Sequence, residues 1–218
     1  MRLVLASTSA ARLAVLQGAG ITPAARFAPT VDEEAALAAH QVTQNRVLSA
    51  AETVQFLARI KAESVIAAHG AAADGLVLGG DSMFLLDGEI LGKPHLPEIA
   101  MNRARAHRGK TGVLYSGHWL AECQNGEIVN SAGLVDTATV RLNADVTDAE
   151  LAAYIATGEP LELAGGFAID GLAGAFIDRI EGTPSCVMGL SLPALRALMQ
   201  QLGHEYVALW GENGENSR

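Results

Sequence analysis

The chain has 218 residues, of which 50% are apolar, and a formal charge of −9 at pH 7. This length and apolar content suffice for one large domain with a sizeable core. The negative charge argues against general binding to nucleic acid. No apolar run is long enough to cross a membrane, and the leading run Leu3–Ala6 is too short for a signal peptide.

The chain contains two cysteines, Cys123 and Cys186, which are far apart in the sequence. Neither belongs to a C-x-x-C motif or to a Cys/His spacing typical of zinc sites. This usage favours a reduced, cytoplasmic setting in which both thiols pack as small apolar groups.

The first third of the chain predicts a strand, a helix, an extended stretch and a long helix. The continuous apolar run Arg2–Ala6 is typical of a buried strand. Helical spacing begins at Ala10 and continues to Gln17, and glycines follow it. Two prolines favour an extended conformation over residues 21–34, and a long helical pattern covers about 50–68.

The remainder alternates strands, turns and helices. The predicted elements are a buried strand at Leu76–Leu78, a turn at Asp87-Gly88, a helix from Pro97 to Gly109, a hairpin with its turn at Asn125-Gly126, a helix after the capping box Thr147–Glu150, a strand at 174–180 and a helix at Pro193–Leu202. Together they predict an α/β fold with a mixed β-sheet and flanking helices. We expect one domain over residues 1–210 and a flexible tail at 211–218.

The stretch "LVLASTSAAR" places three hydroxyl side chains where a strand meets a helix. The unpaired N–H groups at a helix start attract anions such as phosphate. Ser7 and Ser9 can cap the helix or donate to phosphate, and Arg12 lies about one turn further on. From this stretch alone, a serine cap with a solvated arginine is the better interpretation.

Four further residues could bind a ligand, and each also has a purely structural interpretation. Asp81 follows the strand "GLVLGG", at the end of a strand where open α/β sheets bind ligands, but it could simply cap a turn. Lys93 precedes a proline and suits phosphate, although a lone lysine is usually solvated. Lys61 reaches into a cleft or extends to solvent, and Glu33 is a ligand or a helix N-terminal acid.

In combination, these cations and carboxylates suit a metal-bound polyphosphate better than any one residue does alone. The basic run Arg103–Lys110 is better explained as a solvated helix end. None of the six histidines has a metal-ligand partner at helical or strand spacing, and we assign them no role.

The order of short motifs along the chain resembles that of the Maf family, also called septum formation inhibitor Maf. The resemblance extends from Leu3 to about Leu202. The motifs are "LASTSAAR", "VDE", "KA", "GDS", "LGKP", "YIATGEP", "AGGFAIDG" and "GTPSCVMGLSL".

The resemblance implies a nucleoside triphosphate pyrophosphatase that converts an NTP to an NMP and pyrophosphate with a divalent ion, Mg²⁺ or Mn²⁺. Such enzymes are thought to remove non-canonical or surplus nucleotides. The implied fold is similar to that of inosine triphosphatases, with two lobes around a deep cleft and frequent homodimers. A non-enzymatic regulator of cell division, acting through protein partners, is the alternative.

The resemblance also implies roles for individual residues. Asp81 corresponds to the family's catalytic aspartate, which also binds the metal, and Glu33 corresponds to a metal ligand. The residues implied to bind substrate are Ser7, Ser9, Arg12, Lys61, Lys93 and Asp170. The chain departs from the family pattern at Ala10 and Ala11, where proline and a first arginine are usual, and at Asp170, where glutamine is frequent.

Overall fold

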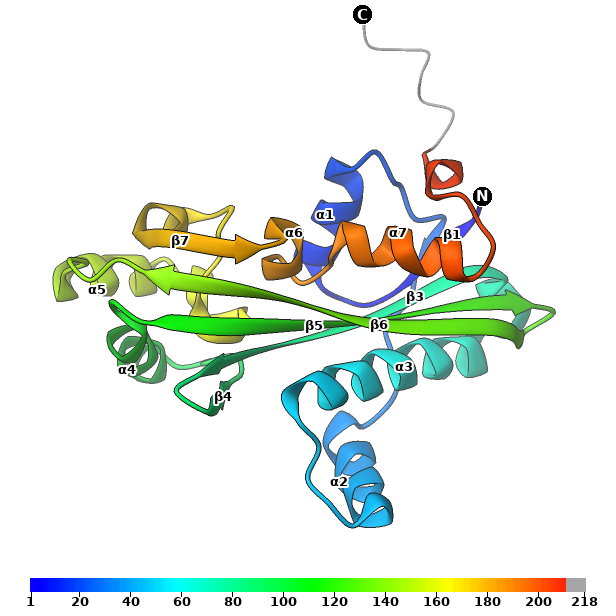
Figure 1. Ribbon diagram of the computed structural model, residues 1–218, viewed down its shortest axis with the longest axis horizontal. Coiled ribbons are helices and arrows are strands. Elements are labelled where there is room, and N and C mark those ends of the chain that lie inside the picture. Colours follow the sequence, from blue (N-terminus) through cyan, green and yellow to red (C-terminus); the bar gives the residue numbers. More distant parts are fainter. Residues whose placement is uncertain (211–218) are drawn as a thin grey trace, which may run out of the picture. The chain divides into compact units, whose positions relative to one another are not determined.

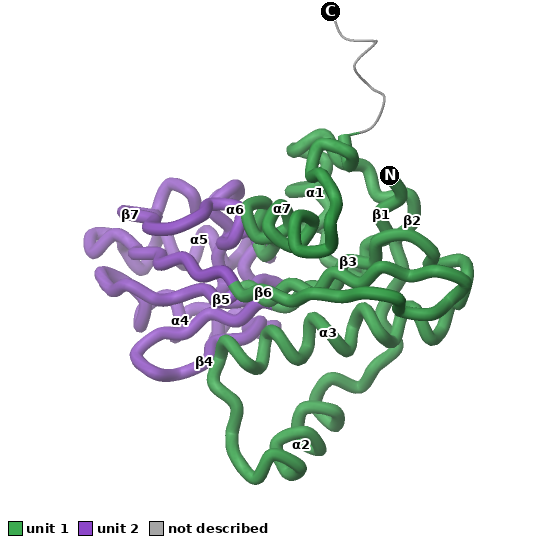
Figure 2. The backbone as a smooth tube through the Cα atoms, turned by 45° about the vertical axis from the view of Figure 1, so that its right-hand side comes forward, with its two compact units in different colours: residues 1–81, 116–135, 189–218 green, residues 82–115, 136–188 purple. Residues whose placement is uncertain are grey.

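The computed structural model describes residues 1–210, which fold into two compact units (Figure 2). Unit 1 comprises Met1–Asp81, Ser116–Val135 and, among the described residues, 189–210, and unit 2 comprises Ser82–Tyr115 and Asp136–Met188. The predicted tail at 211–218 lies outside the described residues. The single domain over 1–210 stays a prediction.

Parallel strands form one side of unit 1. Strand β1 (Leu3–Ala6) pairs in parallel with β2 (Ala25–Arg26) and with the first part of β3 (Gly75–Leu86). The strand order continues through β5 (Thr111–Gln124) to β6 (Glu127–Leu142), and each of these two strands also contributes residues to unit 2. The predicted hairpin is confirmed, with Asn125 and Gly126 at positive φ in its turn.

Helices cover both faces of the sheet in unit 1. Helix α3 (Ala50–His69) lies on one face, and α1 (Ala10–Gly18) and α7 (Leu192–Gln201) lie on the other (Figure 1). Helix α3 approaches β3 so closely that a Cβ at Gly79 would overlap the carbonyl oxygen of Ala58. Glycine at this position therefore permits close contact between the helix and the strand.

The extended prediction for residues 21–34 is only partly correct. Before Asp32 the segment contains only the short strand β2 and otherwise no regular element, and helix α2 (Glu33–Gln44) then begins, which the sequence analysis did not predict. Asp32 caps this helix by accepting a hydrogen bond from the N–H of Ala35 at 3.0 Å. Helix α2 packs on α3 but buries no residue completely, and four of its six apolar residues are alanines, which give a weak apolar pattern.

In unit 2, antiparallel strands carry two helices. Strand β4 (Glu89–Leu91) pairs with the end of β3, and β7 (Ile177–Gly182) pairs with β6. Helix α4 (Pro97–His107) packs on α5 (Asp148–Ala156), which begins at the predicted capping box. A short helix α6 (Pro184–Val187) follows β7. The parallel and antiparallel pairs confirm the predicted α/β fold with a mixed sheet and flanking helices.

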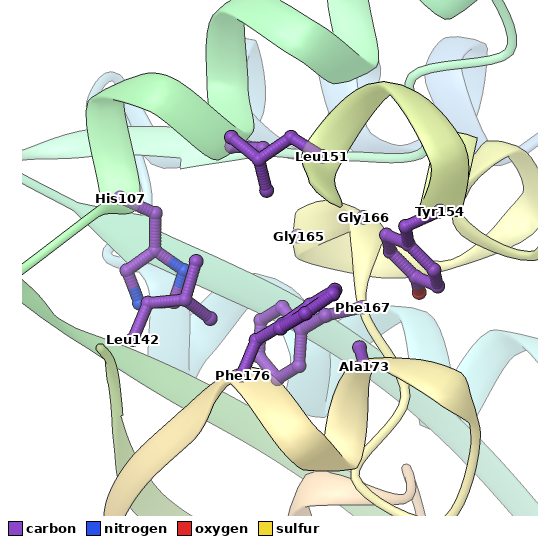
Figure 3. Close-up of a pocket in the computed structure, with 10 residues that line it drawn as sticks. His107, Leu142, Leu151, Tyr154, Gly165, Gly166, Phe167, Ala173 and Phe176 are labelled. Atoms are coloured by element: carbon purple, nitrogen blue, oxygen red, sulfur yellow. The ribbon is translucent and has the colours of Figure 1, made fainter. Parts of the chain in front are cut away.

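The core of unit 2 contains a small apolar cavity bordered by aromatic rings (Figure 3). Its volume is about 20 Å³, and its ring-bearing lining residues are His107, Tyr154, Phe167 and Phe176. A cavity of this size holds about one water molecule. None of the predicted site residues lines it, so we regard this cavity as a feature of the core.

Both cysteines are free thiols buried in the protein, as predicted. In the part of the chain that the structure describes, no helix has the length and apolar character needed to cross a bilayer.

Candidate functional site

The loop between β1 and α1 presents backbone N–H groups at the start of the helix. Ser9 is the N-cap, and its Oγ accepts a hydrogen bond from the N–H of Arg12 at 3.3 Å. The N–H of Ser9 donates to Oγ of the buried Ser7 at 3.1 Å. Within residues 1–210, no acceptor is bonded to the N–H groups of Thr8, Ala10 and Ala11. These groups leave partial positive charge at the helix end.

Arg12 extends from α1 and is fixed at two of its nitrogen atoms. Its Nε donates to the carbonyl oxygen of Gly189 at 2.8 Å, and Nη1 donates to Ser7 Oγ at 3.2 Å. Burial lowers the pKa of Arg12, while the negative charges of Asp81 and Glu33 oppose that effect. Arg12 is therefore a positioned cation rather than the solvated arginine that the local sequence favoured.

Strand β3 places successive residues on opposite faces of the sheet. A Cβ at Gly79 would meet α3, whereas a Cβ at Gly80 would lie 3.1 Å from Nε of Arg12. Asp81, two residues after Gly79, therefore faces α3, where it meets Lys61. The two glycines give both α3 and Arg12 room to approach the strand immediately before Asp81.

Lys61, Asp81 and Glu33 form an ion-paired cluster. Lys61 Nζ lies 2.6 Å from Asp81 Oδ1 and 2.9 Å from Glu33 Oε2. The side chains of Lys61 and Asp81 are only 11% and 12% exposed, whereas that of Glu33 is 45% exposed. Glu33 is the first residue of α2, which agrees with its interpretation as a helix N-terminal acid, and its role as a ligand stays a prediction.

The pKa of Asp81 is perturbed by its surroundings. Burial raises the pKa of Asp81 above the usual range of an aspartate, and the nearby carboxylate of Glu33 adds to this effect. The charges of Lys61 and Arg12, together with the hydrogen bond from Lys61, oppose the rise. A carboxylate with a raised pKa is a stronger proton acceptor, which suits a general base.

The cluster offers a divalent ion two carboxylates, those of Glu33 and Asp81. Across the described residues 1–210, no group of three or more His, Cys, Asp or Glu side chains is arranged to hold a metal. Mg²⁺ usually binds through one or two carboxylates together with substrate phosphates and water. The residues therefore fit a metal that arrives with a polyphosphate and do not form an all-protein metal site.

The other two predicted site residues, Lys93 and Asp170, belong to unit 2. Lys93 is exposed, and its Nζ lies 3.5 Å from Oε2 of Glu162. The other carboxylate oxygen of Glu162, Oε1, lies 3.1 Å from His95 Nδ1. Asp170 is exposed in a turn. The structure thus gathers six of the predicted residues in unit 1, and the roles of Lys93 and Asp170 stay predictions.

Two residues near this site were not found by sequence reasoning. Gly189 supplies the carbonyl oxygen that holds Arg12, and Arg26 donates from β2 to carbonyl oxygens of the loop before α1. Every residue has a backbone carbonyl, so the residue type at Gly189 gives no indication that its carbonyl oxygen binds Arg12. A single arginine in a short extended stretch likewise resembles an ordinary surface residue.

The sequence profile of the family described as "Maf-like protein" matches residues 2–202. The chain belongs to the Maf-like family. This confirms the resemblance that its motifs indicated.

Relatives of the chain align with nearly all of it. A protein named nucleoside triphosphate pyrophosphatase from Leifsonia xyli subsp. xyli is 55% identical over 98% of this chain and 99% of its own. Proteins of the same name from Corynebacterium jeikeium and Thermosynechococcus vestitus are 46% and 45% identical, covering 97% and 92% of this chain and 100% and 93% of theirs.

One solved structure, that of the Staphylococcus aureus Ham1 protein, aligns with 93% of this chain and 96% of its own. Its sequence identity is 10% and its TM-score is 0.38. A TM-score this low supports no conclusion about a common fold. The predicted similarity to inosine triphosphatases therefore stays a prediction.

Proposed function

We propose that this Maf-like chain hydrolyses nucleoside triphosphates between the α- and β-phosphates and releases a nucleoside monophosphate and pyrophosphate. The observation that carries the proposal is the ion-paired cluster in which Lys61 lies 2.6 Å from the buried Asp81 and 2.9 Å from Glu33. The cluster belongs to a chain whose full-length relatives are named nucleoside triphosphate pyrophosphatase.

The phosphates bind at the start of α1 in this proposal. The N–H groups of Ala10 and Ala11 point out of the helix end and donate to phosphate oxygens. The hydroxyls of Ser7 and Ser9 line the same loop, and the guanidinium of Arg12 adds a bidentate contact. Lys93 supplies a further positive charge to the triphosphate, and Asp170 contributes to substrate binding.

Asp81 acts as the general base. Its carboxylate orients a water molecule and accepts a proton as the water oxygen bonds to the α-phosphorus. The bond from that phosphorus to the bridging oxygen breaks, and pyrophosphate leaves. Lys61 holds the carboxylate in place and contributes positive charge near the phosphates, so positioning and charge stabilisation supply most of the acceleration.

The family is compatible with a divalent cofactor, and we propose Mg²⁺ or Mn²⁺ for this chain. Glu33 and Asp81 are the residues that hold it. When bound, the ion neutralises charge on the triphosphate. The exposed side chain of Glu33 can turn away from Lys61 to reach an ion, because it is much less confined than Asp81.

The wider setting is also part of the proposal. The free buried thiols agree with a cytoplasmic location, and the charge of −9 agrees with a small-molecule substrate rather than a nucleic acid. We propose a homodimer that removes non-canonical or surplus nucleotides.

Asp81→Asn tests the catalytic assignment. We expect kcat to fall by about 10²–10⁴-fold, the usual contribution of a general base. The matched control is Asp87→Asn, because Asp87 also lies 2.6 Å from a lysine, Lys110, but in an exposed pair. The assay measures pyrophosphate released from a panel of canonical and modified NTPs with Mg²⁺ or Mn²⁺.

Three results would contradict the proposal. Near-full turnover of Asp81→Asn would remove Asp81 as the base. Release of orthophosphate instead of pyrophosphate would indicate a phosphatase. Absence of turnover by the wild-type protein with every NTP would favour the non-enzymatic regulator.

A further inference from the structure

Arg26 holds the loop that precedes α1. Arg26 of β2 pairs with Leu5 of β1 in the parallel register. Its side chain therefore starts close to the end of β1, where the loop begins. Arg26 Nε donates to the carbonyl oxygen of Ser7 at 2.8 Å, and Nη2 donates to the carbonyl oxygen of Thr8. One guanidinium therefore fixes two consecutive peptide groups.

Fixing these carbonyl groups also fixes the N–H groups that follow them. In a trans peptide, the C=O and the next N–H point in opposite directions. With the carbonyls of Ser7 and Thr8 directed at Arg26, the N–H groups of Thr8 and Ser9 are directed away from it. The N–H of Ser9 meets Ser7 Oγ, and that hydroxyl also accepts from Arg12. Arg26 and Arg12 thus hold opposite sides of one loop.

The backbone that carries Arg26 is itself well anchored. The N–H of Phe27 donates to the carbonyl oxygen of Leu5 at 3.0 Å. The ring of Phe27 stacks on His69 with a centroid separation of 3.8 Å. The guanidinium is therefore attached to a fixed point on the sheet.

The charge of Arg26 is not neutralised by an acid. The side chain is exposed, and among residues 1–210 no carboxylate lies within ion-pair distance of it. Its partners are neutral carbonyl groups, so a full positive charge remains beside the helix start. This charge occurs in a chain that has Ala11 rather than a cation two residues after the N-cap.

We propose that Arg26 is a positioning residue for the triphosphate. It keeps the carbonyl oxygens of Ser7 and Thr8 turned away from the phosphates and keeps the N–H of Thr8 directed away from Arg26 and available to them. This inference rests on the proposed function, because it assumes that the phosphates bind at the start of α1. Without Arg26, the two carbonyls are free to rotate toward the phosphates and repel them.

The test compares Arg26→Ala with Arg2→Ala. Arg2 is a matched control, because it is also exposed and also donates to two backbone carbonyls, those of Ala72 and Asp74, away from the loop. We expect Arg26→Ala to raise KM for the preferred NTP about tenfold, in line with the loss of a charge-assisted hydrogen-bond pair. We expect kcat to change by less than about twofold, because Asp81 and Lys61 are untouched.

Arg26→Lys and a binding measurement complete the test. Lysine restores the charge but cannot donate to both carbonyls in the planar geometry of arginine, so we expect KM between those of the wild type and Arg26→Ala. Calorimetric titration with inorganic pyrophosphate should show the same loss of affinity in Arg26→Ala as the rise in KM.

The outcomes separate this inference from the proposed function. An unchanged KM and unchanged pyrophosphate affinity in Arg26→Ala would overturn the role of Arg26. So would equal effects of Arg26→Ala and Arg2→Ala on KM and on thermal unfolding, since both would then be structural. If the wild type released no pyrophosphate, the proposed function would fail, and the titration would still decide whether Arg26 supports phosphate binding.

Discussion

The most informative perturbation of the site is Lys61→Met, which removes the ammonium group between two carboxylates. The replacement keeps the length and apolar stem of the side chain but leaves Asp81 without its closest cation. The side chains of Lys61 and Asp81 are 11% and 12% exposed, so they count as a buried pair. Breaking such a pair from one side costs about 3–5 kcal/mol.

The contact with Glu33 adds little to this cost. The side chain of Glu33 is 45% exposed, and ion pairs with an exposed member contribute about 1 kcal/mol or less. We therefore expect Lys61→Met to lower the free energy of unfolding by about 3 kcal/mol near neutral pH. Lys110→Met is the control, because Lys110 lies at the same 2.6 Å from Asp87 with both side chains more than half exposed. Lys110→Met should lower the free energy of unfolding by no more than about 1 kcal/mol.

The loss of stability caused by Lys61→Met should be larger at high pH than at low pH. Burial already raises the pKa of Asp81 in the folded state, so ionisation of Asp81 opposes folding as pH rises from its unfolded pKa through its folded pKa. Removing Lys61 raises the folded pKa further and widens this window. The destabilisation is therefore full above the new folded pKa and disappears as pH falls and Asp81 becomes protonated.

Urea unfolding followed by circular dichroism, in the presence of EDTA, measures these differences at about pH 8 and about pH 5. The double variant Lys61→Met/Asp81→Asn should be more stable than Lys61→Met alone, because the unpaired charge is gone. Equal losses for Lys61→Met and Lys110→Met, or a loss independent of pH, would refute the argument that Asp81 is a buried charge held by Lys61.

Two further predictions concern the scaffold. Gly79→Ala should destabilise the fold by about 3 kcal/mol in thermal or urea unfolding, since its Cβ would overlap the carbonyl oxygen of Ala58. Gly18→Ala is the control, because a Cβ at Gly18 would have no atom within 4 Å, and it should change stability by less than about 1 kcal/mol. Similar losses of stability for both variants would contradict the close approach of α3 to β3. Hydrogen bonds from Arg46 hold the pKa of Glu52 at about 2 in the folded state, below its value in the unfolded chain. The ionised side chain of Glu52 therefore stabilises the fold fully above the unfolded pKa, and this stabilisation is lost as pH falls through about 2. Glu52→Gln should therefore lower the melting temperature near neutral pH but not at the acid end of the titration, and a constant difference would show that the charge of Glu52 contributes nothing.

Much of the scaffold was predictable because its signals are local. The capping box at Thr147–Glu150 and the Asn125-Gly126 turn depend on residues within a few positions of one another, and both occur where predicted. The strand before Ser7 and the helix after Ser9 follow in the same way from a short apolar run and an N-cap serine. Helix α2 was missed because it follows two prolines in an extended stretch and its apolar residues are mostly alanines, which mark an apolar face only weakly.

By itself, the sequence determined the family, the α/β class and the residue types able to hold a polyphosphate. It could not determine which of those residues meet. Whether Lys61 reaches solvent or Asp81 depends on how helix α3 folds back on strand β3, which follows it in the chain and which it approaches closely only because Gly79 has no side chain. Tertiary structure also decided the orientation of Arg12, since the carbonyl oxygen that fixes it belongs to Gly189. Local rules cannot specify such contacts, because they arise from packing between segments that are neighbours only after folding.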